Sequence, residues 1–575
     1  MVTDQPQQTE NQFNLLDESW ITCLMLNRQE ETLSLRDLFT RCHEISRISG
    51  DSPHQATSIL RLALAIFWRA HLTVGTLGTR RTDPEQWWSD SFADDSAEPV
   101  KHTAGNRVSD TVIGPVHHYL EAYTDRFALF HPSQPFFQVS DLHKADGSHL
   151  PVSRLIPEAE NDYFTLRAGT GPTTLSYPEA ARWLVCIQAY DYSGIKPGAV
   201  GDPRVKNNKG YPIGPGWTGQ AGIVVLHGRS LRETLLLNTP ASFLQALHRE
   251  NPQDLPPWER HPDGPAPRAE DTVFPEGPCD VLTWQSRRVR LGRGDGVVTG
   301  VLVSNGDKIE NKNQFFDPMT AYRYSKNQSS KLQTVHMPQE HDPDLTVWRG
   351  LAPMLHRTPS PSTDSLDTAG RIPTTVDALQ GLMLPRDSED FTVVTELVGA
   401  KYGAQQSSHT DTINAILPLR MSLLLSQENR PARTVVNAAQ AALDATVALG
   451  QFAGHLRQAA GGDYSFQPLP RESVLHELQA HFARWIVTIT PTVDLNNASS
   501  QWEDTVRQAV LNEASTLLRS VSPRVMIGTE VEGDPPRLVS GSSAWTRLHR
   551  RLDDILPTTA RISSNNPTAA STEGA

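Results

Sequence analysis

Apolar residues in the first part of the chain recur at helical spacing between residues 55 and 72. Six of them define the repeat, namely Ile59, Leu60, Leu62, Ala63, Ile66 and Phe67. This spacing predicts a helix with a buried face over Gln55–Leu72. Comparable patterns predict helices over Glu179–Tyr190 and Leu231–Leu247. Several core helices are therefore expected in this part of the chain.

Short apolar runs between these segments predict strands. One is the run GIVVLHG at Gly222–Gly228. Val289–Gly292 and Gly296–Val303 flank a glycine-rich turn and predict a pair of strands. Prolines in the stretch HPSQP predict a turn into a short strand at PFFQV, Pro135–Val139. Helices and strands are therefore mixed in this region.

Two stretches show no periodicity. Lys196–Gln220 is rich in glycine, proline, asparagine and lysine. It predicts a long loop, and long loops inside folded domains are usually functional or disordered. Asn251–Asp280 contains eight prolines and is expected to be irregular, because proline lacks the N–H group that helices and sheets use.

From about Ser407 the pattern changes to amphipathic segments. Four of them follow one another, at about Thr410–Ser426, Pro431–Ala459, Arg471–Ile489 and Gln501–Ser520, with a shorter fifth at Ser543–Leu556. Polar residues, glycines and prolines separate them, as in an antiparallel helical bundle. The second segment would form a helix ~43 Å long at 1.5 Å per residue.

We therefore predict an α+β protein with a large mixed N-terminal domain followed by a C-terminal antiparallel four-helix bundle. The 575 residues are too many for one ordinary core. The predicted bounds are 1–405 for the mixed domain, 406–556 for the bundle and 557–575 for a polar, disordered tail.

The composition narrows the class of protein. Hydrophobic residues make up 38% of the chain and charged residues 20%, which excludes disorder throughout. No window approaches the ~18 uninterrupted apolar residues of a membrane helix. The N-terminus, MVTDQPQQTENQFNLLDESW, lacks the pattern of a signal peptide. We expect a cytoplasmic protein without a membrane partner.

Cysteine usage gives no sign of a metal or a disulfide framework. The four cysteines lie far apart and form no CxxC pair; they are Cys23, Cys42, Cys186 and Cys279. A zinc site is therefore not expected. Each cysteine is expected to be a small apolar core residue.

The net charge is −13, from 52 basic and 65 acidic residues, which argues against a protein coated in nucleic acid. A local excess of positive charge remains within residues 195–232. It comes from Lys196, Arg204, Lys206, Lys209, Arg229 and Arg232 against Asp202. This stretch indicates either a local basic site or an ordinary solvated loop.

Enzyme motifs are nearly absent. The chain lacks HExxH, GxSxG and the phosphate-binding loop pattern. One GxGxxG occurs at Gly214, Gly216 and Gly219, but it precedes a strand, whereas a dinucleotide site needs it between a strand and a helix. The dipeptide His341-Asp342 would suit a metal-dependent phosphohydrolase only with further ligands at helical spacing. No cofactor is therefore expected.

Five blocks in order along the chain carry a family resemblance. They are FNLLDESWI at Phe13–Ile21, HPSQPFFQV at His131–Val139, GYPIGPGWTGQAGIVVLHGRSLRETLLLNTP at Gly210–Pro240, DPMTAY at Asp317–Tyr322, and the terminal bundle. The chain resembles the large subunit of type I-E CRISPR Cascade, the CasA family.

The resemblance implies a non-catalytic subunit of an RNA-guided surveillance complex. Such a subunit recognises the protospacer-adjacent motif in double-stranded DNA, wedges the duplex open for R-loop formation and docks the helicase-nuclease. The guide RNA reads the remaining sequence. Implied partners are the crRNA-containing Cascade subunits, which are the backbone, 5′-handle-binding and small subunits. Alternatives are a metal-dependent phosphohydrolase and a scaffold with no DNA contact.

By resemblance, three elements read the motif, largely from the minor groove, and two of them are lysine-bearing loops. The first is Lys206–Gly210, where Gly210 would let the backbone approach the groove, while Lys206 and Lys209 contact phosphates. The second carries a lysine finger, for which Lys308 and Lys312 are both candidates. The alternatives are an ordinary turn glycine and solvated lysines.

The resemblance also implies a wedge and a subunit-contact loop. The wedge is a glutamine hairpin at Lys401–Ser407, with Gln405 and Gln406 at its tip against the first base pair beyond the motif. In the contact loop near the guide RNA, Tyr163 and Phe164 would stack on a base or fill a protein pocket. Some relatives bind zinc through cysteine pairs that this chain lacks, so no metal is carried over.

Overall fold

The computed structural model describes residues 12–93, 111–156, 172–268, 274–330, 333–342, 370–380, 382, 390–425, 429–531 and 536–557. Tyr163 and Phe164, and the predicted tail beyond residue 557, lie outside these described residues. The chain divides into two units. The first unit contains the described residues up to Ile416 except Asp390–Thr392, and the second contains those three residues and the described residues from Leu417 onward.

Helix α2 (Pro53–Thr73) forms the centre of the first unit and confirms the predicted first helix. It begins at Ser52, whose hydroxyl accepts a hydrogen bond from the Gln55 N–H, and Pro53 suits the first helical turn. Nearly every side chain from His54 to Leu72 is buried, so the helix is covered on all sides and not on one face alone. It contacts α5 (Tyr177–Tyr190), α4 (Gly114–Ala122) and α8 (Pro278–Leu282).

A buried ion pair ties α2 to the block DPMTAY. Two guanidinium nitrogens of Arg61 lie 2.7 and 3.1 Å from the carboxylate oxygens of Asp317. The same carboxylate accepts hydrogen bonds from the Trp217 indole at 2.7 Å and from the Met319 N–H at 3.0 Å. Both charged side chains are essentially inaccessible to solvent. Asp317 therefore serves the core.

Antiparallel strands surround this centre. β1 (Ile21–Met25) lies between β2 (Glu30–Leu33) and β3 (Ile45–Ile48). β8 (Arg287–Arg293) and β9 (Val297–Asn305) form the predicted pair, and β4 (Leu175–Ser176) lies on the other side of β9. β7 (Ile223–His227) confirms the strand predicted at GIVVLHG. The α+β class is thereby confirmed.

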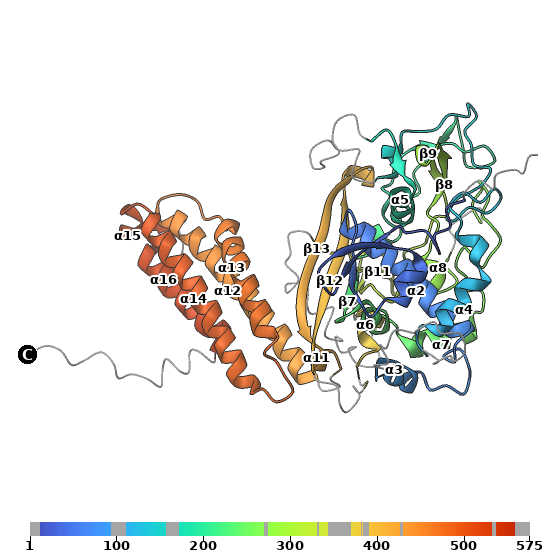
Figure 1. Ribbon diagram of the computed structural model, residues 1–575. Helices are drawn as coiled ribbons and strands as arrows, with labels where there is room; N and C mark the ends of the chain where they lie inside the picture. The colour runs from blue at the N-terminus through green and yellow to red at the C-terminus, as the bar shows by residue number, and fades with distance from the viewer. Residues whose placement is uncertain are drawn as a thin grey trace, which may run out of the picture. The chain divides into compact units, whose positions relative to one another are not determined.

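A long hairpin continues the sheet of β7. Figure 1 shows β12 (Thr392–Tyr402) and β13 (His409–Arg420) side by side, with the strand order β13-β12-β7. The predicted helix over Thr410–Ser426 is therefore wrong, because only the short helix α11 (Met421–Leu425) follows the strand. The buried residues of β13 (His409, Ile413, Leu417 and Leu419) are spaced by even numbers and therefore share one face of an edge strand.

Two smaller predictions are also corrected. The predicted helix over Leu231–Leu247 is two helices, α6 (Leu231–Leu237) and α7 (Ala241–Glu250), because Pro240 has no N–H to continue the helix. The predicted strand at PFFQV is a turn, in which Phe137 adopts a φ of 53°.

Short elements complete the first unit. They are α1 (Leu35–Thr40), α3 (Pro84–Ala93), η1 (Thr124–Phe127), η2 (Val152–Leu155), β5 (Lys196–Pro197), β6 (Lys209–Gly210), η3 (Thr218–Gln220), β10 (Tyr322–Tyr324), β11 (His336–Pro338), α10 (Thr374–Asp377) and η5 (Ala404–Gln406).

The described residues of the second unit include four long helices. They are α12 (Asn429–Ala459), α13 (Pro468–Ile486), α14 (Leu495–Ser520) and α16 (Gly541–Ile555). α12 contacts the other three, and α13 contacts α14 (Figure 1). Trp502 packs against Phe482 and Trp485, and its indole donates a hydrogen bond of 2.8 Å to the Ala438 carbonyl. The short elements α15 (Arg524–Ile527), β14 (Thr529–Val531) and β15 (Arg537–Val539) lie between the last two helices in sequence.

None of the described helices combines the length and the hydropathy that crossing a bilayer requires.

Replacement of Asp317 by asparagine should lower the free energy of unfolding by about 3–5 kcal/mol, because Arg61 would remain charged and buried without its partner. Urea denaturation of the full chain at pH 7 measures this change. Asp295→Asn, at an exposed carboxylate in the β8–β9 turn, is the matched control and should change stability by less than about 0.5 kcal/mol. Equal effects of the two substitutions would contradict the role of the Arg61–Asp317 pair.

Candidate nucleic-acid interface

The predicted glycine-containing loop ends in a tight two-residue turn. Lys206 and Lys209 exchange backbone hydrogen bonds of 3.0 Å in both directions across Asn207 and Asn208. The two asparagines have φ values of 53° and 60°, as a type I′ turn requires. Asparagine tolerates this left-handed backbone better than most residues, so the turn forms without glycine at its tip. Both lysine side chains are exposed.

Gly210 lies just behind this turn, in β6, opposite Lys196. It is buried, and a Cβ atom there would lie 2.9 Å from the side-chain nitrogen of Asn305. That nitrogen donates a hydrogen bond of 2.6 Å to the Tyr211 carbonyl. The missing side chain therefore lets β6 pack against the end of β9.

Both candidates for the lysine finger follow the end of β9. Lys308 and Lys312 are exposed, so either side chain could reach a ligand. Arg204, in the loop that carries the two-residue turn, donates hydrogen bonds to the carbonyls of Asn305 at 3.1 Å and Gly306 at 2.9 Å. The structure therefore joins the two lysine-bearing loops at their bases.

The predicted wedge is the tip of the β12–β13 hairpin. Gln405 and Gln406 are both exposed, and both have a φ of 55°. The Gly403 N–H donates a hydrogen bond of 2.9 Å to the Ser408 carbonyl and closes the loop. The hairpin thus presents two exposed, uncharged amides on a strained backbone.

The tip end of this hairpin is anchored on the segment that leads into β5. The Tyr402 hydroxyl donates a hydrogen bond of 2.8 Å to the Tyr190 carbonyl. Gly219 packs so closely on the Tyr402 hydroxyl that a Cβ atom would collide with it. A Cβ atom at Gly194 would lie 3.8 Å from the Ser407 carbonyl. The glutamine tip and the loop of the lysine turn therefore both contact the short segment Tyr190–Lys196.

Asp191, in this segment, is completely buried and faces three cationic side chains. Nη2 of Arg154 lies 2.8 Å from Oδ1, Nζ of Lys196 lies 3.2 Å from Oδ2, and Arg287 donates its Nε–H to Oδ2. Burial opposes ionisation, but these three positive charges hold the pKa of Asp191 well below its usual range. In the sequence this cluster is marked only by Arg287, which opens a strand that holds four arginines in seven residues.

Lys196 was counted in the basic stretch of the sequence, but it is buried. Its Nζ lies 3.9 Å from the centre of the Tyr192 ring and donates a hydrogen bond of 2.9 Å to the Tyr192 carbonyl. Burial, aided by the charges of Arg154 and Arg287 and opposed by Asp191, lowers the pKa of Lys196 to about 7. The exposed lysines of the stretch are those of the turn.

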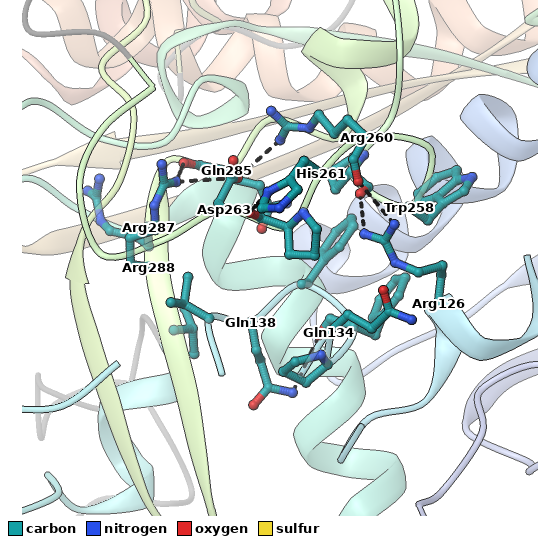
Figure 2. Close-up of a pocket in the computed structure, with 17 residues that line it drawn as sticks. Arg126, Gln134, Gln138, Trp258, Arg260, His261, Asp263, Gln285, Arg287 and Arg288 are labelled. Atoms are coloured by element: carbon teal, nitrogen blue, oxygen red, sulfur yellow. Dashed lines mark hydrogen bonds and ion pairs between the residues drawn. The ribbon is translucent and has the colours of Figure 1, made fainter. Parts of the chain in front are cut away.

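Four arginines line a small cavity next to β8 (Figure 2). Its volume of about 30 Å³ holds no more than a couple of water molecules, which is too little for a nucleotide. Arg126 donates a hydrogen bond of 3.0 Å to the Arg260 carbonyl, Arg260 pairs with Asp263 at 3.2 Å, and Arg288 pairs with Asp307 at 3.0 Å. These arginines hold chain segments together, so the cavity is not a candidate active site.

The glycine motif has a packing role. Cβ atoms at Gly216 and Gly219 would collide with the backbone of Ala189 and with a tyrosine hydroxyl, respectively. Gly214 has a φ of 103°, which favours glycine. The four cysteines are buried and form no disulfide, which confirms their assignment to the core.

His341 is also engaged in packing. Its Nε2 lies 3.0 Å from the Ile223 carbonyl, and burial lowers its pKa. Asp342 beside it is exposed. In the part of the chain that the structure describes, no three His, Cys, Asp or Glu side chains are grouped as metal ligands.

Comparison with known proteins gives consistent matches. The family model for CRISPR-associated protein Cse1 matches residues 14–512. The chain is 28% identical to CRISPR-associated protein CasA/Cse1 of Thermus thermophilus over 465 residues, which cover 78% of this chain and 77% of the relative. The crystal structure of Thermobifida fusca Cse1 matches with a TM-score of 0.80 and 31% identity, over 95% of this chain and 98% of that chain. A chain in a structure of a CRISPR RNA-guided surveillance complex shares the fold, with a TM-score of 0.60 and 19% identity, over 88% of this chain and 99% of that one.

Lys196→Met should change the pH dependence of folding stability. Between pH ~7 and ~10 the unfolded chain keeps the lysine proton while the folded chain has lost it, so this group makes stability rise with pH. The variant has no such group, so the difference in free energy of unfolding, variant minus parent, should be greatest near pH 6. By pH 10 this difference should fall by on the order of 3 kcal/mol.

Urea denaturation of parent and variant across this pH range measures the difference. Lys206→Met, at an exposed lysine of the same loop, is the control and should run parallel to the parent. If Lys196→Met also ran parallel, the buried environment assigned to Lys196 would be refuted.

Proposed function

Because the chain belongs to the CRISPR-associated protein Cse1 family, we propose that it is the non-catalytic large subunit of an RNA-guided surveillance complex. In this proposal it recognises the protospacer-adjacent motif in double-stranded DNA, opens the duplex and docks the helicase-nuclease. It works in the cytoplasm with the crRNA-containing subunits. The observation that carries the proposal is an exposed glutamine tip, Gln405-Gln406, anchored beside two joined lysine-bearing loops.

Motif reading is assigned to the two-residue turn and to one finger lysine. The turn is narrow because Asn207 and Asn208 complete it with left-handed backbone, and the minor groove is only ~6 Å wide. Lys206 and Lys209 flank the tip, where their ammonium groups would meet the phosphates on either side of the groove. Gly210 supports the turn from β6 by packing against β9.

Duplex opening is assigned to the tip of the β12–β13 hairpin. Separating one base step costs a few kcal/mol, and guide–target pairing must supply most of it. Gln405 and Gln406 carry amides that can donate and accept hydrogen bonds, so they offset part of the lost base contacts. Their lack of charge avoids the cost of desolvating an ion between stacked bases.

The helices of the second unit are assigned to the displaced strand and the nuclease. α12, α13, α14 and α16 would form the antiparallel four-helix bundle, with α12 in contact with the other three. The shared fold with a chain of a CRISPR RNA-guided surveillance complex supports a place for this subunit among crRNA-bound partners.

Two alternative functions, a scaffold without DNA contact and a phosphohydrolase, can be distinguished from the proposed one by experiment. A scaffold without DNA contact would give no photocrosslinks between a motif-bearing duplex and probes at Lys308, Lys312 or Gln406 in the assembled complex. A phosphohydrolase would turn over generic phosphoesters with divalent metals and lose this activity in His341→Ala. We expect crosslinks and no turnover.

Removal of both tip amides should slow R-loop formation more on linear than on negatively supercoiled DNA, because supercoiling lowers the cost of opening. The double variant Gln405→Gly with Gln406→Gly is suitable, since glycine keeps the left-handed backbone without strain. We expect about a tenfold lower rate on the linear substrate, measured by permanganate reactivity of unpaired thymines.

The control replaces both residues by asparagine, which keeps an amide and tolerates positive φ. It should retain most of the parent's rate. If the glycine variant matched the parent on both substrates, the wedge assignment would be lost.

The finger lysine can be identified by single substitutions. Lys308→Ala and Lys312→Ala, tested separately in the assembled complex, should give one loss of about tenfold and one small loss in motif-dependent affinity. Electrophoretic mobility shift with motif-bearing and scrambled duplexes measures both. Lys144→Ala removes a partly buried lysine that pairs with Asp146, outside both lysine-bearing loops, and is the control. Two negligible losses would place the finger outside this loop.

A further inference from the structure

Five residues form a closed circuit of contacts beneath the two lysine-bearing loops: Asp191, Lys196, Gly210, Asn305 and Arg287. Lys196 contacts Asp191 and pairs with Gly210 across β5 and β6. Gly210 packs against the side chain of Asn305. Asn305 pairs with Arg287 across β8 and β9, and Arg287 returns to Asp191. We call this circuit the Asp191 ring.

Both loops begin at the ring. Lys209 directly precedes Gly210, and Lys308 follows Asn305 by three residues. Arg287 also donates one hydrogen bond of 2.9 Å to the Gly214 carbonyl, where the loop of the two-residue turn returns to the core. A shift within the ring would therefore change the spacing between the exposed lysines.

The ring and its neighbour Arg154 contain more positive than negative charge. Side-chain exposure is 0% for Asp191, 1% for Arg287 and 2% for Lys196. With Arg154, three cationic groups surround one carboxylate in the interior. Like charges repel strongly where solvent does not screen them, so the carboxylate is what keeps these groups together.

The glutamine tip connects to the same place. The Tyr402 hydroxyl, at the end of β12, binds the carbonyl of Tyr190, the residue before Asp191. The Asp191 N–H in turn donates a hydrogen bond of 3.1 Å to the Ile187 carbonyl and continues the last turn of α5. Asp191 is thus fixed to a core helix on one side and to the candidate interface on the other.

We propose that Asp191 is a positioning residue that sets the spacing between the Lys206–Lys209 turn and the Lys308 loop, so that both engage one duplex. That this spacing serves DNA binding rests on the proposed function, but the spacing itself can be measured without DNA. Asp191 is buried and touches no nucleic acid; it acts through Lys196 and Arg287.

The first experiment measures the spacing directly. Spin labels at Lys209→Cys and Lys308→Cys of the full chain report the distance between the loops by double electron–electron resonance, and the four native cysteines are buried. The parent should give a narrow distance distribution. Asp191→Asn should broaden or shift it, because an amide cannot hold the cations together.

Asp317→Asn is the matched control. It removes a buried carboxylate that lies outside the ring and pairs with Arg61. This variant should be less stable than the parent, but its distance distribution should stay narrow. If Asp191→Asn does not fold, Lys196→Met replaces it. That variant removes one of the three cations, so it should fold and still broaden the distribution, since β5 loses its anchor.

The second experiment measures motif discrimination in the assembled complex, as the ratio of affinities for motif-bearing and scrambled duplexes. Asp191→Asn or Lys196→Met should lower this ratio by about tenfold, while Asp317→Asn should keep it.

A narrow, unshifted distance distribution in the folded Asp191→Asn or Lys196→Met variant would overturn the proposal. A broadened distribution with unchanged discrimination would overturn its link to DNA reading. A parent complex without discrimination would refute the proposed function, whereas the distance measurement would still test the ring.

Discussion

One buried carboxylate, that of Asp191, neutralises part of the charge on three cationic side chains from distant parts of the sequence. A cation buried without a partner is costly, so these chain segments can meet only where the carboxylate is present. The meeting point lies at the end of α5, directly below the loops that carry the exposed lysines. The arrangement of the candidate interface therefore depends on charged side chains that are buried beneath it.

The distribution of charge suits a protein that must not bind DNA indiscriminately. A net charge of −13 disfavours general attraction to the phosphate backbone. Exposed lysines occur where the two loops project, and the hairpin tip carries neutral amides. In the proposed function, phosphate contacts of these lysines would position a duplex, while the amides would enter the stack without bringing an ion into it. Affinity would then come from a few placed contacts and from the partners of the complex.

Local patterns in the sequence predicted α2, β7 and the β8–β9 pair correctly, because their periodicity reflects burial. The pattern failed at β13, where Ile413 and Leu417 are four residues apart and mimic a helical face, although the same even spacing places both on one face of an edge strand. The candidate loops were found only through family resemblance. Asp191 and Arg287 could not be found by either route, since their role depends on a strand register and a helix end that only the folded chain brings together.

In the proposed function, a neutral glutamine tip opens the duplex beside a lysine turn held at fixed spacing. The decisive measurement is the structure of the assembled complex on a motif-bearing duplex. We expect the side chains of Gln405 and Gln406 at the first base pair beyond the motif, with the Asn207-Asn208 turn in the adjacent minor groove. A duplex that is opened while the tip points into solvent, or lies on the far side of the subunit from the turn, would contradict it.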